Sequence, residues 1–421
     1  MQGTNHDDLR RQNLSIILRL VHRGGAASRA QLTRLTGLNR STIGALVAEL
    51  VERGLVEERT PDPTKLAGRP SPIVAASDRV VAIAVNPEMD AITVGVVALS
   101  GVVHQRIRFA TPTSATVAEA VTIVAGIVAD LRRDLVGYSI MGIGVAVPGL
   151  VRASDGLVRN APHLGWVDEP LCDLLATVTG LPVVAANDAS LGVTAEHYFG
   201  AGRAMTDLIY LNGGSSGIGG GLIVGGVAAG GRSGYAGEFG HTRVSAGCRT
   251  DSAGIAGTLE AEVTRDLLLE VLGLPAGETD ADTLERAPLA SDAPAVRAEV
   301  NRQLDFLAVA LAVAVNTLNP ELIVLGGFLG ALYAADPGRL TRAVAALTLA
   351  AAFYDVQIAP AFLGSNLLLI GAAELAFEAL LLDPQSDRGN TSGLSPLGVR
   401  AAGSVTAAVS PEIAPATIQP L

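Results

Sequence analysis

Polar side chains that could carry chemistry are gathered in a few glycine-rich stretches of this 421-residue chain. One stretch, GYAGEFGH at residues 234–241, places Glu238 three positions before His241. A carboxylate and an imidazole at this spacing could transfer protons, ligate a metal ion or hydrogen-bond a small molecule. His241 could equally be a core histidine whose ring nitrogens are satisfied by neighbouring groups, so the pair alone does not decide the chemistry.

A second polar pair ends an apolar run. The stretch LPVVAAND, residues 181–188, predicts a buried strand that finishes in Asn187 and Asp188. Polar side chains beyond the carboxyl end of a strand are typical of ligand sites in α/β proteins, although the same two residues could simply cap a turn.

The composition indicates an α/β protein with substantial cores. Hydrophobic residues make up 49% of the chain, aromatic residues only 4%, and there are 48 glycines. The length allows two or three domains. The chain has no uninterrupted run of about eighteen apolar residues and no secretory signal, so we expect no membrane span. The two cysteines, Cys172 and Cys248, exclude a disulfide framework and favour a cytoplasmic protein.

Charge is unevenly distributed along the chain. The net charge is −11, but residues 1–80 carry 12 basic and 8 acidic side chains, whereas the remainder carries 18 and 33. A basic N-terminal unit could bind a phosphate backbone that an acidic body would repel. Because basic surfaces are often only solvated, the charge favours a nucleic-acid partner without establishing one.

The N-terminal segment has the pattern of three short helices followed by a hairpin. Apolar residues recur at helical spacing in three runs, residues 14–24, 29–36 and 40–53. Ser28 and Asn39 are suited to cap the second and third helices, and Gly37 to end the second. Residues 55–60 and 73–76 predict two strands. This order predicts a winged helix-turn-helix, although a small helical domain without a DNA role is the alternative.

In a winged helix-turn-helix, the N-terminal residues of the third helix meet base edges in the major groove. Arg40, Ser41 and Thr42 occupy these positions. Lys65 and Arg69 lie in the wing, the loop between the two predicted strands, where flanking glycine and proline hold the arginine on a narrow backbone that could enter a minor groove. We therefore expect double-stranded DNA as a partner.

Beyond the wing, strand patterns alternate with helical ones, which predicts an α/β architecture. Similar strand-rich stretches at 80–110 and 207–224 predict two related lobes with a cleft between them. Long helices are expected near 258–272 and 296–318, either as dimer surfaces or as buried core. The last stretch is rich in Ser, Gly, Pro and Ala and lacks periodicity, so residues 384–421 are expected to form a disordered tail.

Seven motifs, taken in order, resemble the ROK family of repressors, open reading frames and sugar kinases. They are VAVPGLV (145–151), APHLGW (161–166), AANDAS (185–190), SGIGGGLIVGG (216–226), YAGEFGH (235–241), the TLEA after Gly257, and NPELIVLGG (319–327). The combination is specific, although no single motif is. The resemblance implies an α/β actin-like/hexokinase-like two-lobed domain over residues 79–383. It is preceded at 1–78 by the winged helix-turn-helix that the family's repressors add.

The resemblance also implies roles for the polar residues. In the family, the residues that match Asn187, Asp188, Glu238, His241 and Glu260 bind sugar hydroxyls. The residue matching Asp188 is the catalytic base in the kinases, and the one matching His241 also helps to hold a structural zinc. Carboxylates and an amide suit a sugar, because between them they accept and donate hydrogen bonds to vicinal hydroxyls.

One departure from the family pattern concerns the ATP-binding hairpin of the kinases, an acidic, glycine-rich DxGxT turn. Here the stretch is VNPEMDAITVG, in which Asn86 replaces the aspartate and Pro87, Glu88 and Met89 fill the glycine positions. Proline lacks an N–H donor, and glutamate repels phosphate. We therefore expect no productive Mg-ATP binding, and Asp188 would be a sugar ligand rather than a working base.

A further departure concerns the zinc segment, which is CxCGxxGCxE in the family. Here the stretch is CRTDSAGIAGTLE, in which Cys248 is retained and Thr250 and Thr258 stand at the other two cysteine positions. A structural zinc needs four ligands, and His241 with Cys248 supplies two. Asp251 could be a third, but we expect no metal and no other cofactor.

Together these features predict a sugar-responsive DNA-binding regulator, a repressor that acts on a palindromic operator as a homodimer or higher oligomer. Its kinase-like domain would bind a sugar or sugar derivative between the lobes without phosphorylating it, and closure would shift the spacing of the DNA-binding heads. Two alternatives stay open. One is an ATP-dependent sugar kinase with an accessory DNA-binding domain, and the other is a ligand-independent DNA-binding protein whose sugar pocket has decayed.

Overall fold

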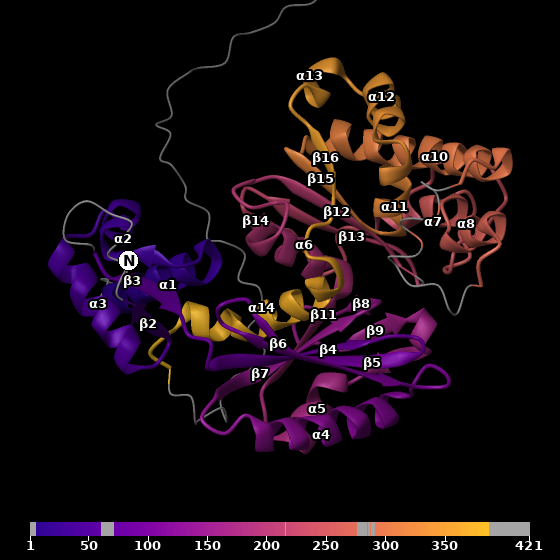
Figure 1. Cartoon of the computed structure of the whole chain (residues 1–421). Coiled ribbons are helices and arrows are strands. Elements are labelled where there is room, and N and C mark those ends of the chain that lie inside the picture. Colours follow the sequence, from indigo (N-terminus) through magenta and orange to yellow (C-terminus); the bar gives the residue numbers. More distant parts are fainter. Residues whose placement is uncertain are drawn as a thin grey trace, which may run out of the picture.

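The computed structural model describes residues 6–59, 71–214, 216–275 and 291–386, together with residues 284 and 287. The predicted wing residues Lys65 and Arg69, and most of the predicted tail, lie outside this part of the chain. Figure 1 shows an N-terminal head beside two lobes, one stacked above the other.

The head is a winged helix-turn-helix, as predicted. Its elements are α1 (His6–Gly24), β1 (Ala27–Ser28), α2 (Arg29–Thr36), α3 (Arg40–Glu52), β2 (Val56–Arg59) and β3 (Ile73–Ala76). The predicted caps are confirmed, because the Ser28 hydroxyl accepts from the Gln31 N–H and the Asn39 side chain accepts from the Thr42 N–H. Gly37 ends α2 at φ 71°, a left-handed conformation that favours glycine.

Each lobe is built on a five-stranded sheet, and the two sheets share one topology. The first sheet, ordered β11-β7-β4-β5-β6, contains β4 (Val80–Pro87), β5 (Ala91–Ala98), β6 (Val103–Ala110), β7 (Ser139–Val147) and β11 (Val183–Asn187). The second, ordered β14-β13-β12-β15-β16, contains β12 (Leu208–Gly214), β13 (Gly217–Val224), β14 (Val227–Ala228), β15 (Leu322–Gly327) and β16 (Gln357–Pro360). In each, an antiparallel three-stranded meander is followed by two parallel strands. The repeat confirms the prediction of two related lobes.

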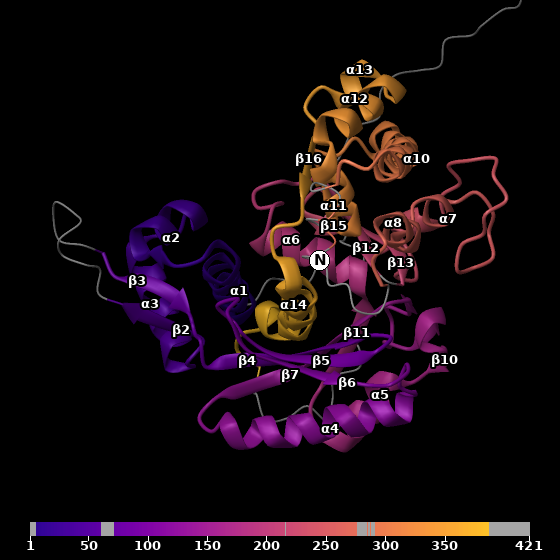
Figure 2. The same ribbon diagram turned by 45° about the vertical axis from the view of Figure 1, so that its right-hand side comes forward.

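Helices cover both faces of each sheet. The outer helices are α4 (Val117–Asp134) and α5 (Leu171–Thr179) on the first sheet, and α10 (Pro294–Leu318) and α11 (Phe328–Ala335) on the second. Between the sheets lie α6 (Asp188–Phe199) and α14 (Leu367–Leu382), in both views (Figures 1 and 2). Along β4, Val81 and Ile83 belong to the core shared with α4, whereas Ala82 and Ala84 belong to the core shared with α14. The strand is therefore apolar on both faces.

Shorter elements complete the two lobes. They are β8 (Leu150–Val151), β9 (Val158–Ala161), β10 (Trp166–Glu169), α7 (Leu259–Glu262), α8 (Arg265–Leu272), α12 (Pro337–Leu347) and α13 (Ala350–Phe353), with single 3₁₀ turns at Pro162–Leu164, Phe239–His241 and Gly364–Asn366. The first three strands form a small antiparallel sheet, ordered β10-β9-β8.

The prediction of one long helix near 258–272 is wrong, because the segment forms two helices, α7 and α8. Val263 is extended, with φ −109° and ψ 97°. The Thr264 hydroxyl accepts from the Leu267 N–H and so caps a new helix. The helix predicted near 296–318 is confirmed as α10.

Helix α14 is long and strongly apolar. With the preceding turn, Gly364–Leu382 is long and apolar enough to cross a membrane by length and composition. Within the fold, however, its apolar side chains are used in the core between the first sheet and α6, where Leu369, Phe377 and Leu381 are each at most 1% exposed. Burial on several sides explains why this helix carries so little polar surface.

The head shares a buried core with the lobe of the first sheet, through α14. Leu14 and Ile17 of α1 belong to the same buried cluster as Phe377 and Leu380 of α14. Gln385, which lies in the segment expected to be disordered, instead donates from its side-chain amide to the Glu49 carboxylate of α3 at 2.9 Å. The described start of the predicted tail is therefore an ordered contact between α14 and the head.

Candidate functional site

The predicted ligand residues begin where β11 runs into α6. The Asn187 side chain caps α6, since its Oδ1 accepts from the Ser190 N–H at 3.0 Å and its Nδ2 donates to the Gly149 carbonyl at 3.1 Å. Asn187 therefore has the capping role that the sequence left open as an alternative. A contact with a ligand would use its remaining amide hydrogen and lone pair.

Asp188 is the first residue of α6, and its Oδ1 accepts from the Ala189 N–H at 2.8 Å. Burial, together with the nearby Glu238 carboxylate, raises the pKa of the Asp188 carboxyl to about 7 against the opposing effect of that hydrogen bond. The group is therefore poised between its neutral and ionised forms near neutral pH. Such a carboxyl could donate or accept a hydrogen bond, and it could also serve as a base.

Glu238 and His241 are brought to the same place by close packing of two glycine-rich segments. A Cβ at Gly220 of β13 would lie 2.5 Å from the Gly237 carbonyl, and a Cβ at Gly240 would lie 2.1 Å from the Ile218 carbonyl. Because both distances are shorter than any real Cβ contact, the turn that carries Glu238 and His241 can lie directly on β13 only if these positions are glycine.

Of the five candidate ligand residues, Glu238 has the fewest polar contacts with the rest of the described protein. Among the described residues its carboxylate has no hydrogen-bond partner, and its nearest charged contact is His241 Nε2 at 3.9 Å. Burial raises the pKa of Glu238, partly offset by His241 and reinforced by Glu260. A carboxylate that is partly desolvated and unpaired suits a ligand hydroxyl, which would satisfy it.

His241 is held from its other side by Asp251, whose Oδ2 accepts from His241 Nδ1 at 2.8 Å. Burial alone would lower the pKa of His241, but the hydrogen bond to Asp251 and the carboxylates of Glu260 and Glu238 outweigh it and raise the pKa. The ring therefore keeps Nδ1 on Asp251 and turns Nε2 toward Glu238.

The Glu260 carboxylate of α7 accepts hydrogen bonds from a backbone N–H of β13 and from a residue of the neighbouring loop. Its Oε2 accepts from the Ile218 N–H at 2.9 Å, and its Oε1 accepts from the N–H and the hydroxyl of Ser252. It joins the start of β13 to the loop after His241. The ligand role that the family resemblance implied for it stays a prediction.

The structure thus brings four of the five predicted ligand residues into electrostatic contact: Asp188 with Glu238, and Glu238 with both His241 and Glu260. Sequence reasoning did not identify the supporting residues Ser252 and Glu262, and it considered Asp251 only as a metal ligand. Among the described residues there is no group of three or more His, Cys, Asp and Glu that could hold a metal ion.

The turn between β4 and β5, where the ATP hairpin was expected to be degenerate, is closed by its own side chains. Glu88 Oε1 accepts from the Thr93 hydroxyl at 2.7 Å and from the Asn86 amide at 3.3 Å. Arg108 of β6 pairs with Asp90 at 2.8 Å and approaches Glu88 at 3.6 Å. Two carboxylates therefore lie in the turn between β4 and β5.

The predicted base-contact residues lie at the start of α3, on the surface of the head. Arg40 and Ser41 are exposed, and Thr42 is partly exposed. The Ser41 hydroxyl donates to the capping Asn39 at 2.7 Å, which ties it to the helix start. Arg40 is exposed and has no hydrogen bond or ion pair with another described residue, so its guanidinium is available for a base contact.

Comparisons with known proteins agree with this architecture. The ROK family model matches residues 82–379, and the MarR family model matches residues 8–65. A xylose repressor of Caldicellulosiruptor bescii is 27% identical over 403 residues, covering 90% of this chain and 99% of that protein. A glucokinase of Halalkalibacterium halodurans is 33% identical over 204 residues, covering 45% of this chain and 61% of that protein.

Among solved structures, a ROK family transcriptional regulator described as a homologue of the E. coli MLC protein has a similar fold. It superposes with a TM-score of 0.73 at 22% identity, covering 89% of this chain and 97% of the other. The match spans the head as well as the lobes, so the resemblance that the motifs indicated extends to the whole architecture. The chain is a member of the ROK family and carries a MarR-type winged helix-turn-helix before the family's actin-like, hexokinase-like fold.

Proposed function

We propose that this protein is a sugar-responsive transcriptional repressor that binds a sugar at Asp188, Glu238 and His241 without phosphorylating it. Relatives that align over nearly their whole length are named xylose repressors, which makes xylose the first sugar to test. In this proposal, residues 1–78 bind DNA, residues 79–383 sense the sugar, and the protein acts in the cytoplasm, where its operator is.

One observation carries the proposal: α6 connects the candidate sugar site to the head. The helix begins at Asp188 and ends at Tyr198 and Phe199. Tyr198 lies under the Arg23 guanidinium of α1, 3.6 Å from carbon to ring centroid, and Phe199 meets the His22 ring edge-on at 5.4 Å. A shift of α6 on ligand binding would therefore reach the DNA-binding head directly.

The head also contacts α14, which packs on the first sheet, whereas α6 packs on the second. The buried Glu374 of α14 accepts from Arg23 at 2.9 Å and from His22 Nε2, while His22 Nδ1 donates to the Leu99 carbonyl. Arg23 thus touches α6 and α14 at once. Closure of the lobes around a sugar would displace one helix relative to the other, and the head would follow both.

The proposal that the sugar is not phosphorylated is supported by the turn between β4 and β5. Phosphate would approach the Glu88 and Asp90 carboxylates there, and Pro87 offers no N–H donor. The sugar-kinase alternative is favoured by one observation, the carboxyl of Asp188 with a pKa of about 7, which suits a general base. Sugar-dependent release of ADP from Mg-ATP, followed with a coupled assay, would identify the kinase.

Replacement of Glu238 by Gln is expected to weaken sugar binding about 10- to 100-fold, because a hydrogen bond to a charged group contributes roughly 1.5–3 kcal/mol. The stability of the chain should change little, since within the described residues this carboxylate has no hydrogen bond to lose. Isothermal titration calorimetry with xylose and a panel of other sugars measures the affinity. Sugar binding by Glu238→Gln at wild-type strength would contradict the assignment of the site.

Arg40→Ala is expected to weaken binding to the operator by about 1–3 kcal/mol, the usual value of a base contact. The operator itself can be selected from random DNA by the wild-type protein, and affinity measured by fluorescence anisotropy at fixed salt. Arg106→Ala, which removes an equally exposed arginine from β6, is the matched control. An equal loss in both variants would indicate non-specific electrostatics rather than base recognition.

The proposal as a whole is tested by adding sugar to the protein–operator complex, with the protein as a homodimer or higher oligomer. A sugar that binds with measurable heat, changes operator affinity and is not consumed with Mg-ATP is the expected result. Operator binding with no response to any sugar of the panel would favour a DNA-binding protein whose sugar pocket has decayed.

A further inference from the structure

The loop Ser245–Gly257 occupies the chain position of the family's zinc segment, but its residues do not fit the metal. Cys248 is exposed, and the other two cysteine positions hold Thr250 and Thr258. His241 Nδ1 already donates to Asp251. A structural zinc takes four Cys, His or carboxylate ligands in a tetrahedron, and the described residues here offer no group of even three.

Asp251 occupies the centre of this loop with every acceptor position used. Its side chain is 0% exposed. Oδ1 accepts from the N–H groups of Ala253 and Ile255, at 2.9 and 2.8 Å, and Oδ2 accepts from His241 Nδ1 at 2.8 Å and from the Thr258 hydroxyl at 2.9 Å. One carboxylate therefore folds the loop with one oxygen and orients the histidine with the other.

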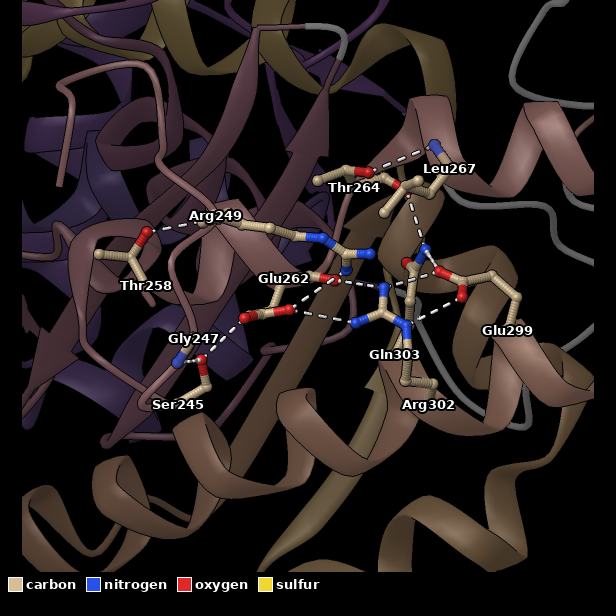
Figure 3. Close-up of polar contacts among 11 residues, drawn as sticks. Ser245, Gly247, Arg249, Thr258, Glu262, Thr264, Leu267, Glu299, Arg302 and Gln303 are labelled. Carbon is tan, nitrogen blue, oxygen red and sulfur yellow. Dashed lines mark hydrogen bonds and ion pairs between the residues drawn. The ribbon is translucent and has the colours of Figure 1, made fainter. Parts of the chain in front are cut away.

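A second anchor holds the same loop to α7 and α10, and Figure 3 shows its side chains converging. The buried Glu262 accepts from the Ser245 hydroxyl at 2.7 Å, from Arg249 at 3.3 Å and from Arg302 at 3.2 Å. Arg302 is itself held by Glu299 at 2.7 Å. The two anchors restrain both ends of the loop by hydrogen bonds and ion pairs alone.

We propose that Asp251 is a positioning residue that replaces the zinc of the family: it fixes the His241 ring with its hydrogen on Nδ1 and presents Nε2 to a ligand hydroxyl beside Glu238. Thr258, at a former cysteine position, supplies the second hydrogen bond that keeps the carboxylate in place. The inference deepens the proposed sugar site and rests on it for the identity of the ligand. The tautomer of His241 and the zinc content are independent of that identity.

Asp251→Asn tests the proposal sharply. The amide oxygen can still accept from Ala253 and Ile255, so the loop keeps its turn, but the amide NH₂ now faces His241 and donates. The neutral His241 ring is expected to switch to the tautomer with hydrogen on Nε2. Long-range ¹H–¹⁵N correlation spectra of the full chain labelled in its 6 histidines report the tautomer, and His241→Gln assigns the signal.

The same variant is expected to bind the sugar about 10- to 100-fold more weakly, because Nε2 with its hydrogen can no longer accept from a sugar hydroxyl; loss of the partner that orients a metal-bound histidine has an effect of about this size. Asp134→Asn, at an exposed position on α4, should change neither the tautomer nor the affinity. Elemental analysis of the purified wild-type protein should find zinc well below one equivalent, and chelator should leave the sugar affinity unchanged.

Either of two results would overturn the inference: one tightly held zinc per chain, or a His241 tautomer that stays the same in Asp251→Asn. If the wild-type protein binds none of the sugars, the proposed function fails. The tautomer and the zinc content still decide whether Asp251 has replaced the metal.

Discussion

Glu374→Gln is expected to disconnect the DNA-binding head from the sugar site. Glu374 is 5% exposed and holds both His22 and Arg23 of α1. Burial would raise its pKa, but these two partners outweigh burial and lower it, so the carboxylate is ionised in the folded protein. Removing one member of a buried ion pair leaves the other charge uncompensated, at a cost of about 3–5 kcal/mol.

This loss of stability should weaken the attachment of the head to α14 and leave the sugar site and the DNA-binding surface unchanged. Sugar affinity, measured by calorimetry, should stay near that of the wild type, because Glu374 does not touch the ligand residues. The sugar-dependent change in operator affinity should be lost or greatly reduced, and chemical unfolding should show the head melting before the lobes.

Glu378→Gln is the matched control, because it makes the same change one turn further along α14 at a residue with no hydrogen bond among the described residues. A Glu374→Gln protein whose operator affinity changes with sugar as much as that of the wild type would show that the junction does not carry the signal.

Asp188→Asn is expected to stabilise the protein at pH 8 by roughly 2–4 kcal/mol and to have little effect near pH 4. The folded-state pKa of Asp188 is raised to about 7, above its value in the unfolded chain of about 4. A group with a raised pKa contributes its full stability below the unfolded value and loses it as pH rises through the folded value. Asn does not titrate, so the difference between the two proteins should grow from about pH 4 to about pH 7 and then stay constant.

Urea unfolding at several pH values measures this difference, with Asp134→Asn as a control that should show no such dependence. Asn keeps an oxygen for the Ala189 N–H, so the start of α6 is preserved. The upper end of the range assumes complete burial, and the partial exposure of Asp188 sets the lower end. A stability difference that is equal at pH 5 and pH 8 would show that burial does not control this carboxyl.

Local signals in the sequence predicted most of the secondary structure correctly. Ser28 and Asn39 cap their helices, and the two strand-rich stretches became two sheets of one topology, because capping and side-chain alternation act between residues that are close in the chain. The break between α7 and α8 was missed, since Thr264 is compatible with both a helix interior and a cap, and only its bond to the Leu267 N–H selects the cap.

The candidate site was predicted as a set of residues but not as an arrangement. Glu238 and His241 were found from their type and spacing, and the structure brings them to Asp188 and Glu260. Asn187 and Glu260 use much of their hydrogen-bonding capacity on backbone groups, and Asp251, considered only as a metal ligand, forms a hydrogen bond with His241. The hydrogen-bond partners of a side chain depend on its neighbours in space, which the spacing of residues along the sequence does not reveal.

The sequence by itself determined the family, the order of head and lobes, most of the helices and strands, and the residue types available to a sugar. Only the tertiary structure decided how the sensor meets the head, because His22 and Glu374 are 352 positions apart and each looks unremarkable in its own helix. Burial makes such a pair matter: removed from water, a charged group must find its partner among whichever side chains the fold brings to it.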